Sequence, residues 1–300
     1  MSSQAKVLLI GATGQVGSAC HESLAQAGYN VIALSRCELD MTALDKIAGA
    51  VAQYDPAIVV NATAYTAVDK AESEADLADT INHLAVKRLA EVCVSRSIPL
   101  IHLSTDYVFD GAGSEPYTED SLVGPQSVYG KTKCLGELAV QSTMSDYLIL
   151  RTSWVFGFQG NNFVKTMLRL AKERDELAVV ADQYGCPTYA GDIADVITIF
   201  ANRYLLQQPI SWGVYHCVCS GRVSWHDFAV SIFNKAHALG VIESMPIVRP
   251  IATSDYPTPA KRPKNSTLDN HKLERVLGYP MPSWEIGLSY LLGTFLDIRR

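Results

Sequence analysis

Short apolar runs alternate with amphipathic segments through the first half of the chain. The apolar runs are rich in Val, Ile and Leu and lack polar alternation, which is typical of strands buried on both faces of a parallel sheet. They cover residues 7–10, 31–34, 58–60, 100–103 and 147–150. Segments of helical periodicity separate them, at residues 16–27, 43–53, 75–95 and 129–142. This order predicts an α/β fold built on a doubly wound, parallel Rossmann sheet.

The pattern becomes less regular after residue 150. A helix is predicted at residues 162–173, a strand at 177–181 and another helix at 193–204. The final third contains most of the prolines of the chain. Because proline interrupts both helices and strands, this region is expected to form a smaller lobe of loops and short helices beside the sheet.

Composition and charge exclude several classes of protein. The chain is 48% hydrophobic and 19% charged, a globular balance, and its net charge of −6 comes without a basic stripe, so nucleic-acid binding is not expected. No apolar run reaches the roughly 20 residues that a membrane span needs, and the first apolar run leads directly into a glycine turn rather than a cleavage site. Seven scattered cysteines indicate reduced thiols and a cytoplasmic protein.

Three glycines follow the first predicted strand at the spacing G-x-x-G-x-x-G. Gly11 permits a tight strand-to-helix turn, Gly14 lets the backbone approach a pyrophosphate, and Gly17 lets the helix pack closely on the sheet. The helix N-terminus then attracts the phosphates. Similar turns occur without ligands, but this position in an α/β pattern predicts dinucleotide binding. The residues assigned to the turn site are Gly11, Thr13, Gly14, Gln15, Val16 and Gly17.

The end of the second predicted strand bears on the choice of cofactor. An NAD site commonly carries Asp or Glu here, which accepts a hydrogen bond from the ribose 2′-hydroxyl and repels a 2′-phosphate. This chain instead has Ser35 and Arg36, a hydroxyl and a guanidinium suited to that phosphate. NADPH is therefore the expected cofactor, with NADH as the alternative. Asp40 and Met41 are assigned to the adenine side, although Asp40 also fits an ordinary helix N-cap.

Tyr129 and Lys133 form a Y-x-x-x-K pair at the start of a predicted helix, where this spacing places both side chains on one face. A nearby ammonium lowers the pKa of a phenol, and Lys133 can also hold the nicotinamide ribose. Thr105 follows the fourth predicted strand, at the end where open α/β sheets bind ligands. Its hydroxyl can bond a substrate carbonyl while Tyr129 protonates it. The predicted catalytic residues of this oxidoreductase are Thr105, Tyr129 and Lys133.

These motifs predict how the chain is divided. Residues 1–152 are expected to form an NAD(P)-binding Rossmann domain, to which elements near 177–181 and 191–218 return. The expected C-terminal substrate-binding lobe comprises about 153–176, 182–190 and 219–300.

Further segments extend the pattern over nearly the whole chain. Besides the glycine turn and YGKTK, they are STDYVFDG (104–111), LRTSWVFG (150–157), DQYGCPTY (182–189) and KRPKNSTLD (261–269). Together they resemble the dTDP-4-dehydrorhamnose reductase family of extended short-chain dehydrogenases. The resemblance implies NADPH-dependent reduction of the C4 ketone of dTDP-4-dehydro-L-rhamnose to dTDP-L-rhamnose, which supplies that sugar for cell-surface polysaccharide. The catalytic Thr, Tyr and Lys of the family fall on Thr105, Tyr129 and Lys133.

The resemblance also implies further contacts. Small residues after the third strand line the cofactor cleft in the family, and here they are Ala62, Thr63 and Ala64, which also suit sheet–helix packing. Two aromatic residues would face the sugar, and three polar residues would reach the nucleotide diphosphate, with Arg262 favoured by its charge. Asn82 fits a structural role as well as a functional one. The residues assigned to the substrate are Ser104, Tyr107, Trp154, Asn162, Gln183 and Arg262.

The metal requirement and the assembly stay open. The family is often described as magnesium-dependent, with carboxylates that link two subunits. The stretch after Pro187 reads Thr-Tyr-Ala-Gly191-Asp192, in which no acidic cluster is recognisable. No metal ligand is therefore assigned, magnesium stays uncertain, and a homodimer is the assembly to be tested.

Two other functions fit parts of the sequence. A 4-keto sugar-nucleotide reductase or epimerase with another substrate would share the fold, whereas a 4,6-dehydratase would carry Asp-Glu after the catalytic Thr, and this chain has Asp106-Tyr107. The second alternative is a non-catalytic, NADP-binding regulatory subunit that resembles the β subunit of methionine adenosyltransferase. A turnover assay without a partner separates it from an enzyme.

Overall fold

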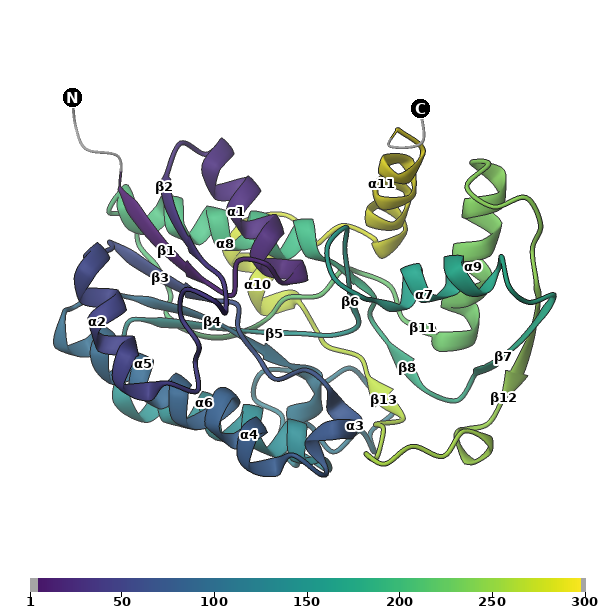
Figure 1. The fold of residues 1–300 in the computed structure, drawn as a ribbon, viewed down its shortest axis with the longest axis horizontal. Helices are drawn as coiled ribbons and strands as arrows, with labels where there is room; N and C mark the ends of the chain where they lie inside the picture. The colour runs from purple at the N-terminus through teal and green to yellow at the C-terminus, as the bar shows by residue number, and fades with distance from the viewer. Residues whose placement is uncertain (1–4, 298–300) are drawn as a thin grey trace.

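Six parallel strands form the central sheet of the computed structural model, which describes residues 5–297 (Figure 1). Their order across the sheet is β10-β5-β4-β3-β1-β2. The strands are β1 (Lys6–Ile10), β2 (Asn30–Leu34), β3 (Ile58–Asn61), β4 (Leu100–Thr105), β5 (Tyr147–Thr152) and β10 (Gly213–His216). The strand order reverses between β1 and β3, the position where doubly wound sheets bind ligands. The predicted doubly wound Rossmann fold is confirmed.

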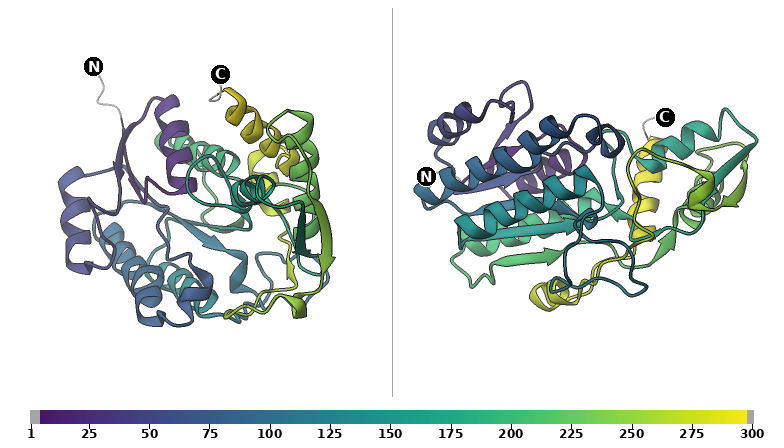
Figure 2. Two further views of the ribbon diagram at one scale, coloured as in Figure 1. Left: turned by 45° about the vertical axis from the view of Figure 1, so that its right-hand side comes forward. Right: turned by 90° about the horizontal axis from the view of Figure 1, so that it is seen from below.

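Helices cover both faces of this sheet. One face packs against α1 (Gln15–Gln26), α8 (Ala190–Leu205) and α10 (His271–Leu277). The other packs against α2 (Leu44–Tyr54), α5 (Ala85–Ser95) and α6 (Val128–Thr143), as Figure 2 shows from below. Along β1, Val7 and Leu9 face the first layer while Leu8 and Ile10 face the second. Burial on both faces explains why the strands read as continuous apolar runs.

The predicted helix at residues 75–95 is interrupted. The structure divides it into α4 (Ala75–Asp79), a π-helical turn (Thr80–Leu84) and α5, and the short α3 (Val68–Ala71) precedes it. The π-helical turn carries the buried side chain of Asn82. Single π turns inside helices are frequent at functional sites.

A smaller lobe lies beside the sheet domain (Figures 1 and 2). Its core is aromatic and aliphatic and includes Phe156, Phe228, Phe233, Trp284 and Leu288. Its helices are α7 (Phe163–Leu170), α9 (Trp225–Ala238) and α11 (Trp284–Asp297). Its strands pair as β7 (Glu176–Val180) with β12 (Ile247–Ile251), β6 (Val155–Phe156) with β9 (Thr188–Tyr189), and β8 (Tyr184–Gly185) with β11 (Val223–Ser224) and β13 (Asn265–Ser266). Among residues 5–297 no helix is long and apolar enough to cross a membrane.

Two expectations about the division of the chain are wrong. The strand predicted at 177–181 does not return to the main sheet; it forms β7, which pairs with β12, and Leu177 packs in the core of the small lobe. Conversely, α10 lies within the segment assigned to the small lobe, yet Leu273 and Leu277 pack in the core of the sheet domain. An apolar run shows that a strand is buried, but it does not show which sheet buries it.

Candidate active site

Polar side chains replace apolar ones in the middle or toward the carboxyl ends of four strands, on the sheet face that α6 covers. All four are at most 4% exposed. They are Asn61 on β3, His102 on β4, Arg151 on β5 and His216 on β10. Asn61 is paired in register with His102, and Arg151 with His216. Opposite this polar row, α6 buries three side chains spaced by four residues, Tyr129, Lys133 and Glu137.

Lys133 is almost fully buried, at 1% exposure, and its amine is bonded to the sheet. Its Nζ donates to the backbone oxygen of Leu103 at 2.6 Å and lies 3.3 Å from Nε2 of His102. Burial lowers the pKa of Lys133 to about 8, and the carboxylate of Glu137 opposes that effect. An amine with such a pKa can change its charge in the working range of an enzyme.

The side chains of Thr105 and Tyr129 lie close enough for the Thr105 hydroxyl to lower the pKa of the Tyr129 phenol. Thr105 Oγ1 also lies 3.0 Å from Asp106 Oδ1, to which it donates, and accepts from the backbone N–H of Tyr107 at 3.2 Å. The predicted catalytic hydroxyls therefore come together at the carboxyl end of β4. Because the only proton of the Thr105 hydroxyl is directed at Asp106, Thr105 must give up that bond in order to donate to a ketone.

The phenol of Tyr129 differs from its expected state. Its pKa is raised by burial, and the Thr105 hydroxyl opposes the increase. In this structure the Lys133 amine bonds to Leu103 and His102 rather than to the phenol, so its effect on this pKa stays a prediction. Burial keeps the phenol protonated, which is the form that a proton donor requires.

The glycine turn has the close contacts that its spacing predicted. Gly11 has φ +85°, and a Cβ there would lie 2.8 Å from the Thr63 side chain. A Cβ on Gly17 would lie 2.1 Å from the backbone oxygen of Gly11, so only glycine fits. Gly14 is the N-cap of α1 and has no side chain to cap it, which leaves the first N–H groups of α1 for an anion. Thr13, Gln15 and Val16 belong to the same turn and first helical residues.

The polar residues after β2 include an acid that the sequence analysis did not select. Glu38 folds back so that its Oε2 accepts from the backbone N–H of Ser35 at 2.7 Å. Arg36 is 74% exposed and its Nε lies 3.5 Å from Asp40 Oδ2. Asp40 also accepts from the N–H of Thr42, whereas Met41 is buried at 4% exposure. Both a carboxylate, as at an NAD ribose, and a guanidinium, as at an NADP phosphate, therefore lie at this end of the sheet.

Two buried amides organise the segment after β3. Asn61 Oδ1 accepts from the backbone N–H and the hydroxyl of Thr63, at 3.1 and 2.5 Å. Asn82 bonds both the N–H and the carbonyl oxygen of Tyr65, at 2.8 and 3.2 Å, and also donates to Thr132 Oγ1 on α6 at 3.1 Å. Residues 62–64 are thus held between the sheet and the catalytic helix, where the cofactor cleft was predicted.

Tyr107 and Arg262 lie together although the sequence separates them widely. The ring of Tyr107 meets that of Tyr129 edge-on, with centroids 5.4 Å apart. Arg262 Nη1 donates to the Tyr107 hydroxyl at 3.4 Å, and Nη2 forms an ion pair with Asp69 at 2.6 Å. Arg262 therefore reaches the catalytic tyrosine region from the small-lobe segment, and Asp69, which sequence reasoning missed, holds it there.

The other residues assigned to the substrate lie in different places. Trp154, with φ +47°, stacks on Trp225 at a ring distance of 3.4 Å. Gln183 donates to Thr253 Oγ1 at 3.1 Å inside the small lobe. Asn162 caps α7 and donates to Gln15 Oε1 at 2.9 Å, so it faces the glycine turn rather than a separate diphosphate site.

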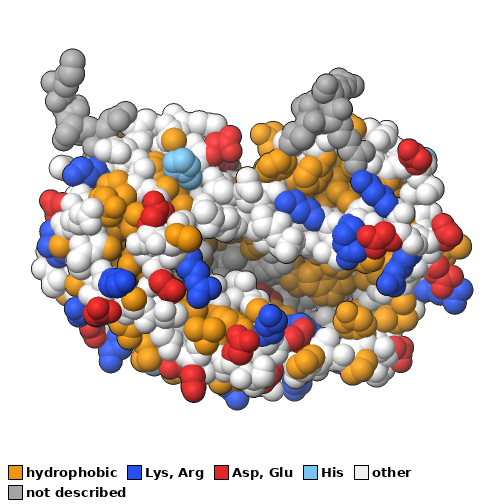
Figure 3. Space-filling view, viewed as in Figure 1, with side chains coloured by type: hydrophobic (Ala, Val, Ile, Leu, Met, Phe, Trp, Pro, Cys, Tyr) orange, Lys and Arg blue, Asp and Glu red, His pale blue; other side chains and the backbone are white. Residues whose placement is uncertain are grey.

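The surface is hollowed between the two lobes, with hydrophobic side chains on the small-lobe side (Figure 3). Near the carboxyl end of β4, the Ser104 hydroxyl is buried and has no hydrogen-bond partner within the described part of the chain. A buried hydroxyl without a partner is unusual in a folded protein and is consistent with the predicted ligand contact.

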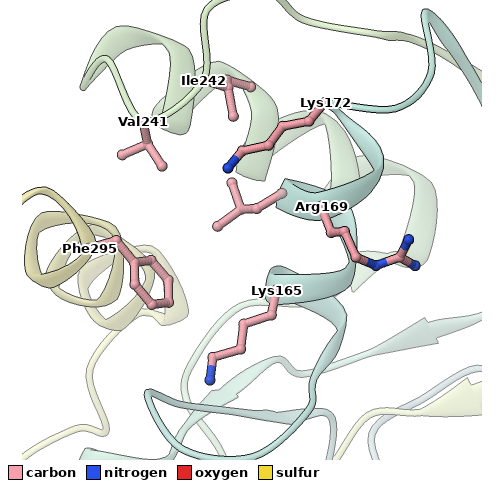
Figure 4. Close-up of a pocket in the computed structure, with 7 residues that line it drawn as sticks. Lys165, Arg169, Lys172, Val241, Ile242 and Phe295 are labelled. Carbon is pink, nitrogen blue, oxygen red and sulfur yellow. The ribbon is translucent and has the colours of Figure 1, made fainter. Parts of the chain in front are cut away.

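A second, apolar cavity of about 370 Å³ lies within the small lobe, between α7, the segment after α9, and α11 (Figure 4). Its rim carries the basic side chains of α7, but they already have partners nearby: Lys165 donates to the Gly160 oxygen at 2.9 Å, and Arg169 pairs with Glu173 at 2.8 Å. None of the predicted catalytic residues lines this cavity, so we do not assign it to the reaction.

The acids near the stretch that follows Pro187 do not form a metal site. Asp192 accepts from the thiol of Cys219 at 3.0 Å, and Asp195 accepts from the Ser23 hydroxyl at 3.0 Å. Among residues 5–297 no three His, Cys, Asp or Glu side chains come together to hold a metal ion. We assign no metal ligand within this described part of the chain, and no step is derived through a metal.

The fold and the arrangement of Thr105, Tyr129 and Lys133 are those of a short-chain dehydrogenase type of oxidoreductase. The family model named RmlD substrate binding domain matches residues 5–296. The dTDP-4-dehydrorhamnose reductase of Aggregatibacter actinomycetemcomitans is 45% identical over 95% of this chain and 97% of its own length, and that of Salmonella typhimurium is 44% identical over 95% and 96%.

Solved structures agree with these sequence relatives. A dTDP-4-dehydrorhamnose reductase from Clostridium acetobutylicum superposes with a TM-score of 0.89 at 40% identity, covering 97% of this chain and 99% of that one. The Bacillus anthracis enzyme, solved in complex with NADP, gives 0.86 at 37% identity, covering 96% and 98%. The chain belongs to the dTDP-4-dehydrorhamnose reductase family and is an NAD(P)-dependent oxidoreductase.

Proposed function

We propose that this chain reduces the C4 ketone of dTDP-4-dehydro-L-rhamnose to dTDP-L-rhamnose, with NADPH as the preferred cofactor. One observation carries the proposal: the Thr105 and Tyr129 side chains come together at the carboxyl end of β4, where the Thr105 hydroxyl influences the pKa of the phenol. That position is where open α/β sheets bind their ligands. The names of the full-length relatives support the identity of the substrate.

The chain's own residues perform the proton chemistry. When bound, the nicotinamide supplies the hydride that reaches C4. Tyr129, kept protonated by burial, gives its proton to the oxygen that becomes negative as the hydride arrives. Thr105 turns its hydroxyl away from Asp106 and donates to the same substrate oxygen, which orients the C4 carbonyl. The ammonium form of Lys133 lies one helical turn from Tyr129 and favours the tyrosinate that remains.

The glycine turn and the end of β2 would hold the cofactor. The uncapped N-terminus of α1 would hold the pyrophosphate, and the exposed guanidinium of Arg36 would hold a 2′-phosphate. The NADP complex of the Bacillus anthracis relative supports NADPH. Glu38 offers a ribose acceptor for NADH as the lesser cofactor.

The small-lobe side would hold the nucleotide sugar. Arg262 is the assigned diphosphate contact because a guanidinium binds phosphate oxygens in pairs. Tyr107 would supply apolar contact to the deoxy sugar, and its position beside Tyr129 places that contact near the reacting carbon. Trp154, stacked on Trp225, would form the wall of the site on the small-lobe side.

The experiment is a single-substrate assay with the purified chain. Incubation with dTDP-4-dehydrorhamnose and NADPH should consume one equivalent of NADPH and yield one of dTDP-rhamnose, seen by absorbance and by chromatography. A dehydratase or epimerase would show no net oxidation of NADPH. Loss of NADPH with another 4-keto sugar only would identify a different reductase, and binding of NADPH without any turnover would favour the regulatory-subunit alternative.

Two further expectations accompany this function. We place the reaction in the cytoplasm, because all seven cysteines are free thiols in the structure and reduced thiols persist there. We also retain the homodimer as a prediction, to be checked by light scattering with and without magnesium. A mass equal to that of one chain under both conditions would reject it.

A further inference from the structure

A chain of buried hydrogen bonds runs from β3 to the catalytic lysine. Asn61 and His102 are paired in register on β3 and β4, and Asn61 Nδ2 lies 3.1 Å from His102 Nδ1. The other ring nitrogen of His102, Nε2, lies 3.3 Å from the Nζ of Lys133. Asn61 and His102 have no exposed surface, so water does not compete for these contacts. The histidine thus connects the asparagine to the lysine.

The orientation of Asn61 determines which nitrogen of His102 carries the proton. Asn61 Oδ1 is occupied by the backbone N–H and the hydroxyl of Thr63, and a backbone N–H can only donate. The amide therefore turns its Nδ2, also a donor, toward His102 Nδ1. Nδ1 must accept, and in a neutral imidazole the other nitrogen then bears the hydrogen. His102 consequently presents Nε2–H to the amine of Lys133.

An ammonium has three donors and no acceptor, so it cannot accept this hydrogen. A neutral amine has one lone pair and can accept from His102 Nε2–H while it donates to the Leu103 oxygen, as the two short contacts require. We infer that Asn61 and His102 are positioning residues for Lys133, which favour its neutral amine and so set the highest pH at which its ammonium is present.

Other titratable groups also surround Lys133. On α6, Glu137 favours the ammonium, but it is itself paired with Arg151 of β5 at 2.7 Å. Tyr129 is kept neutral by burial. Burial also lowers the pKa of His102 well below its usual range, with the Lys133 charge as a second cause, so His102 stays neutral. The tautomer of His102 then decides whether the ammonium or the neutral amine of Lys133 is favoured.

The consequence for catalysis rests on the proposed function. Tyrosinate forms when Tyr129 has given its proton, and it is stabilised by the ammonium rather than by the amine. The Asn61–His102 pair would therefore set the alkaline limb of the pH–rate profile. It would also let Lys133 release its proton at a pH at which an ordinary lysine stays protonated.

The first test measures the tautomer directly in the free chain. In protein labelled with ¹⁵N at histidine, the protonated and unprotonated ring nitrogens resonate in separate regions, and a His102→Gln variant identifies the signals of His102 among the seven histidines. We expect an unprotonated Nδ1 and a protonated Nε2. The reverse tautomer would overturn the inference, and because no substrate is present the result is independent of the proposed reaction.

The second test reverses the tautomer by substitution. In Asn61→Asp one carboxylate oxygen can still accept from Thr63 while the other faces His102 Nδ1, which must then donate. Nε2 becomes an acceptor and favours the ammonium. The titration midpoint of Lys133, followed by NMR of lysine labelled with ¹³C at Cε and identified by its loss in Lys133→Met, should rise by about 1 pH unit or more.

A double-mutant cycle separates the tautomer from the added charge. In a His102→Leu background the carboxylate of Asn61→Asp remains but the histidine does not, so the same substitution should raise the midpoint by less than half as much. Equal shifts in the two backgrounds would mean that the carboxylate acts by charge alone, and the inference would fail. If Asn61→Asp does not fold, the tautomer measurement on the unaltered chain still decides.

Discussion

Glu137 and Arg151 form a buried, bidentate ion pair behind the catalytic helix. Arg151 Nη2 donates to Glu137 Oε2 at 2.7 Å and Nε donates to Oε1 at 2.9 Å, with both side chains at most 5% exposed. The guanidinium also lies over the ring of Phe109, 5.1 Å from its centre. This pair joins the third inward-facing position of α6 to β5, one helical turn beyond Lys133. It therefore fixes the helix that carries the catalytic residues.

Breaking this pair should cost far more stability than breaking an exposed one. Glu137→Gln leaves the Arg151 charge buried without its partner, and the free energy of unfolding should fall by about 3–5 kcal/mol. The control is Glu91→Gln, which breaks a pair with Arg88 that is about 40% exposed on both sides, and it should cost less than about 1 kcal/mol. Urea denaturation measures both. Equal losses in the two variants would contradict the structural role of the buried pair.

The buried carboxyl of Asp106 should make stability depend on pH. Burial raises its pKa to about 6, against hydrogen bonds that include one from Thr105. A raised pKa means that the folded chain holds the proton more tightly than the unfolded one, so stability falls as the pH rises from about 4 through about 6. Asp106→Asn should remove up to about 2–3 kcal/mol of this fall, as measured by urea denaturation at pH 4 and pH 7.

A matched control is available close by. Asp110 is exposed, and the N–H of Ala112 lowers the pKa of its carboxyl. Asp110→Asn should therefore leave the fall in stability between pH 4 and pH 7 in place. An Asp106→Asn variant with the same pH dependence as the unaltered chain would show that Asp106 ionises without cost.

Sequence reasoning found those parts of the site that depend on spacing along one element. Tyr129 and Lys133 are four residues apart on one helix, and Thr105 follows an apolar run, so pattern and position were sufficient to select them. Asn61, His102, Glu137 and Asp69 were not selected, because their partners come from other strands and helices. For Asn61 and His102 the signal was a polar residue in a buried apolar strand, which becomes informative only when the strand order is known.

The errors have the same origin. Glu38 was missed because it lies three residues past Ser35, and only the backbone turn brings its carboxylate back to the strand end. The strand at 177–181 was assigned to the wrong sheet, although its burial alternates at Glu176, Leu177 and Ala178, as in a sheet covered on one face. Apolar runs report burial, whereas the partner of a strand depends on contacts distant in sequence.

Removing the hydroxyl of Tyr129 should abolish most of the proton transfer. Tyr129→Phe keeps the ring against Tyr107, so the fold should persist, while the turnover number should fall by about 10²-fold or more. Binding of NADPH, followed by fluorescence, should change little. Turnover close to that of the unaltered chain would mean that another group is the acid. Tyr117→Phe, which removes a hydroxyl bonded to Asp110 away from Thr105, is the matched control.

Two residues after β2 should each favour a different cofactor, Arg36 NADPH and Glu38 NADH. Arg36→Ala should lower kcat/KM for NADPH by about tenfold or more, because a charge-assisted contact with the 2′-phosphate is lost, with NADH little affected. Glu38→Gln should lower kcat/KM mainly for NADH, because the carboxylate that would accept from the ribose is lost. Steady-state kinetics of each variant with NADPH and with NADH measures these opposite losses. Parallel losses for both cofactors in either variant would indicate only a disturbed turn.

The ion pair of Arg262 with Asp69 leads to a prediction about binding rather than chemistry. If Arg262 holds the diphosphate, which is remote from the reacting carbon, Arg262→Gln should raise KM by about tenfold or more while kcat changes less. Arg262→Lys keeps the charge, but its single ammonium cannot bond Asp69 and Tyr107 in the way that the forked guanidinium does. Its KM should therefore lie between that of the unaltered chain and that of Arg262→Gln. Asp69→Asn tests whether the ion pair aims the guanidinium: it keeps Arg262 but weakens the 2.6 Å contact, and KM should rise modestly. A fall in kcat for Arg262→Gln without a change in KM would place Arg262 at the reacting centre instead.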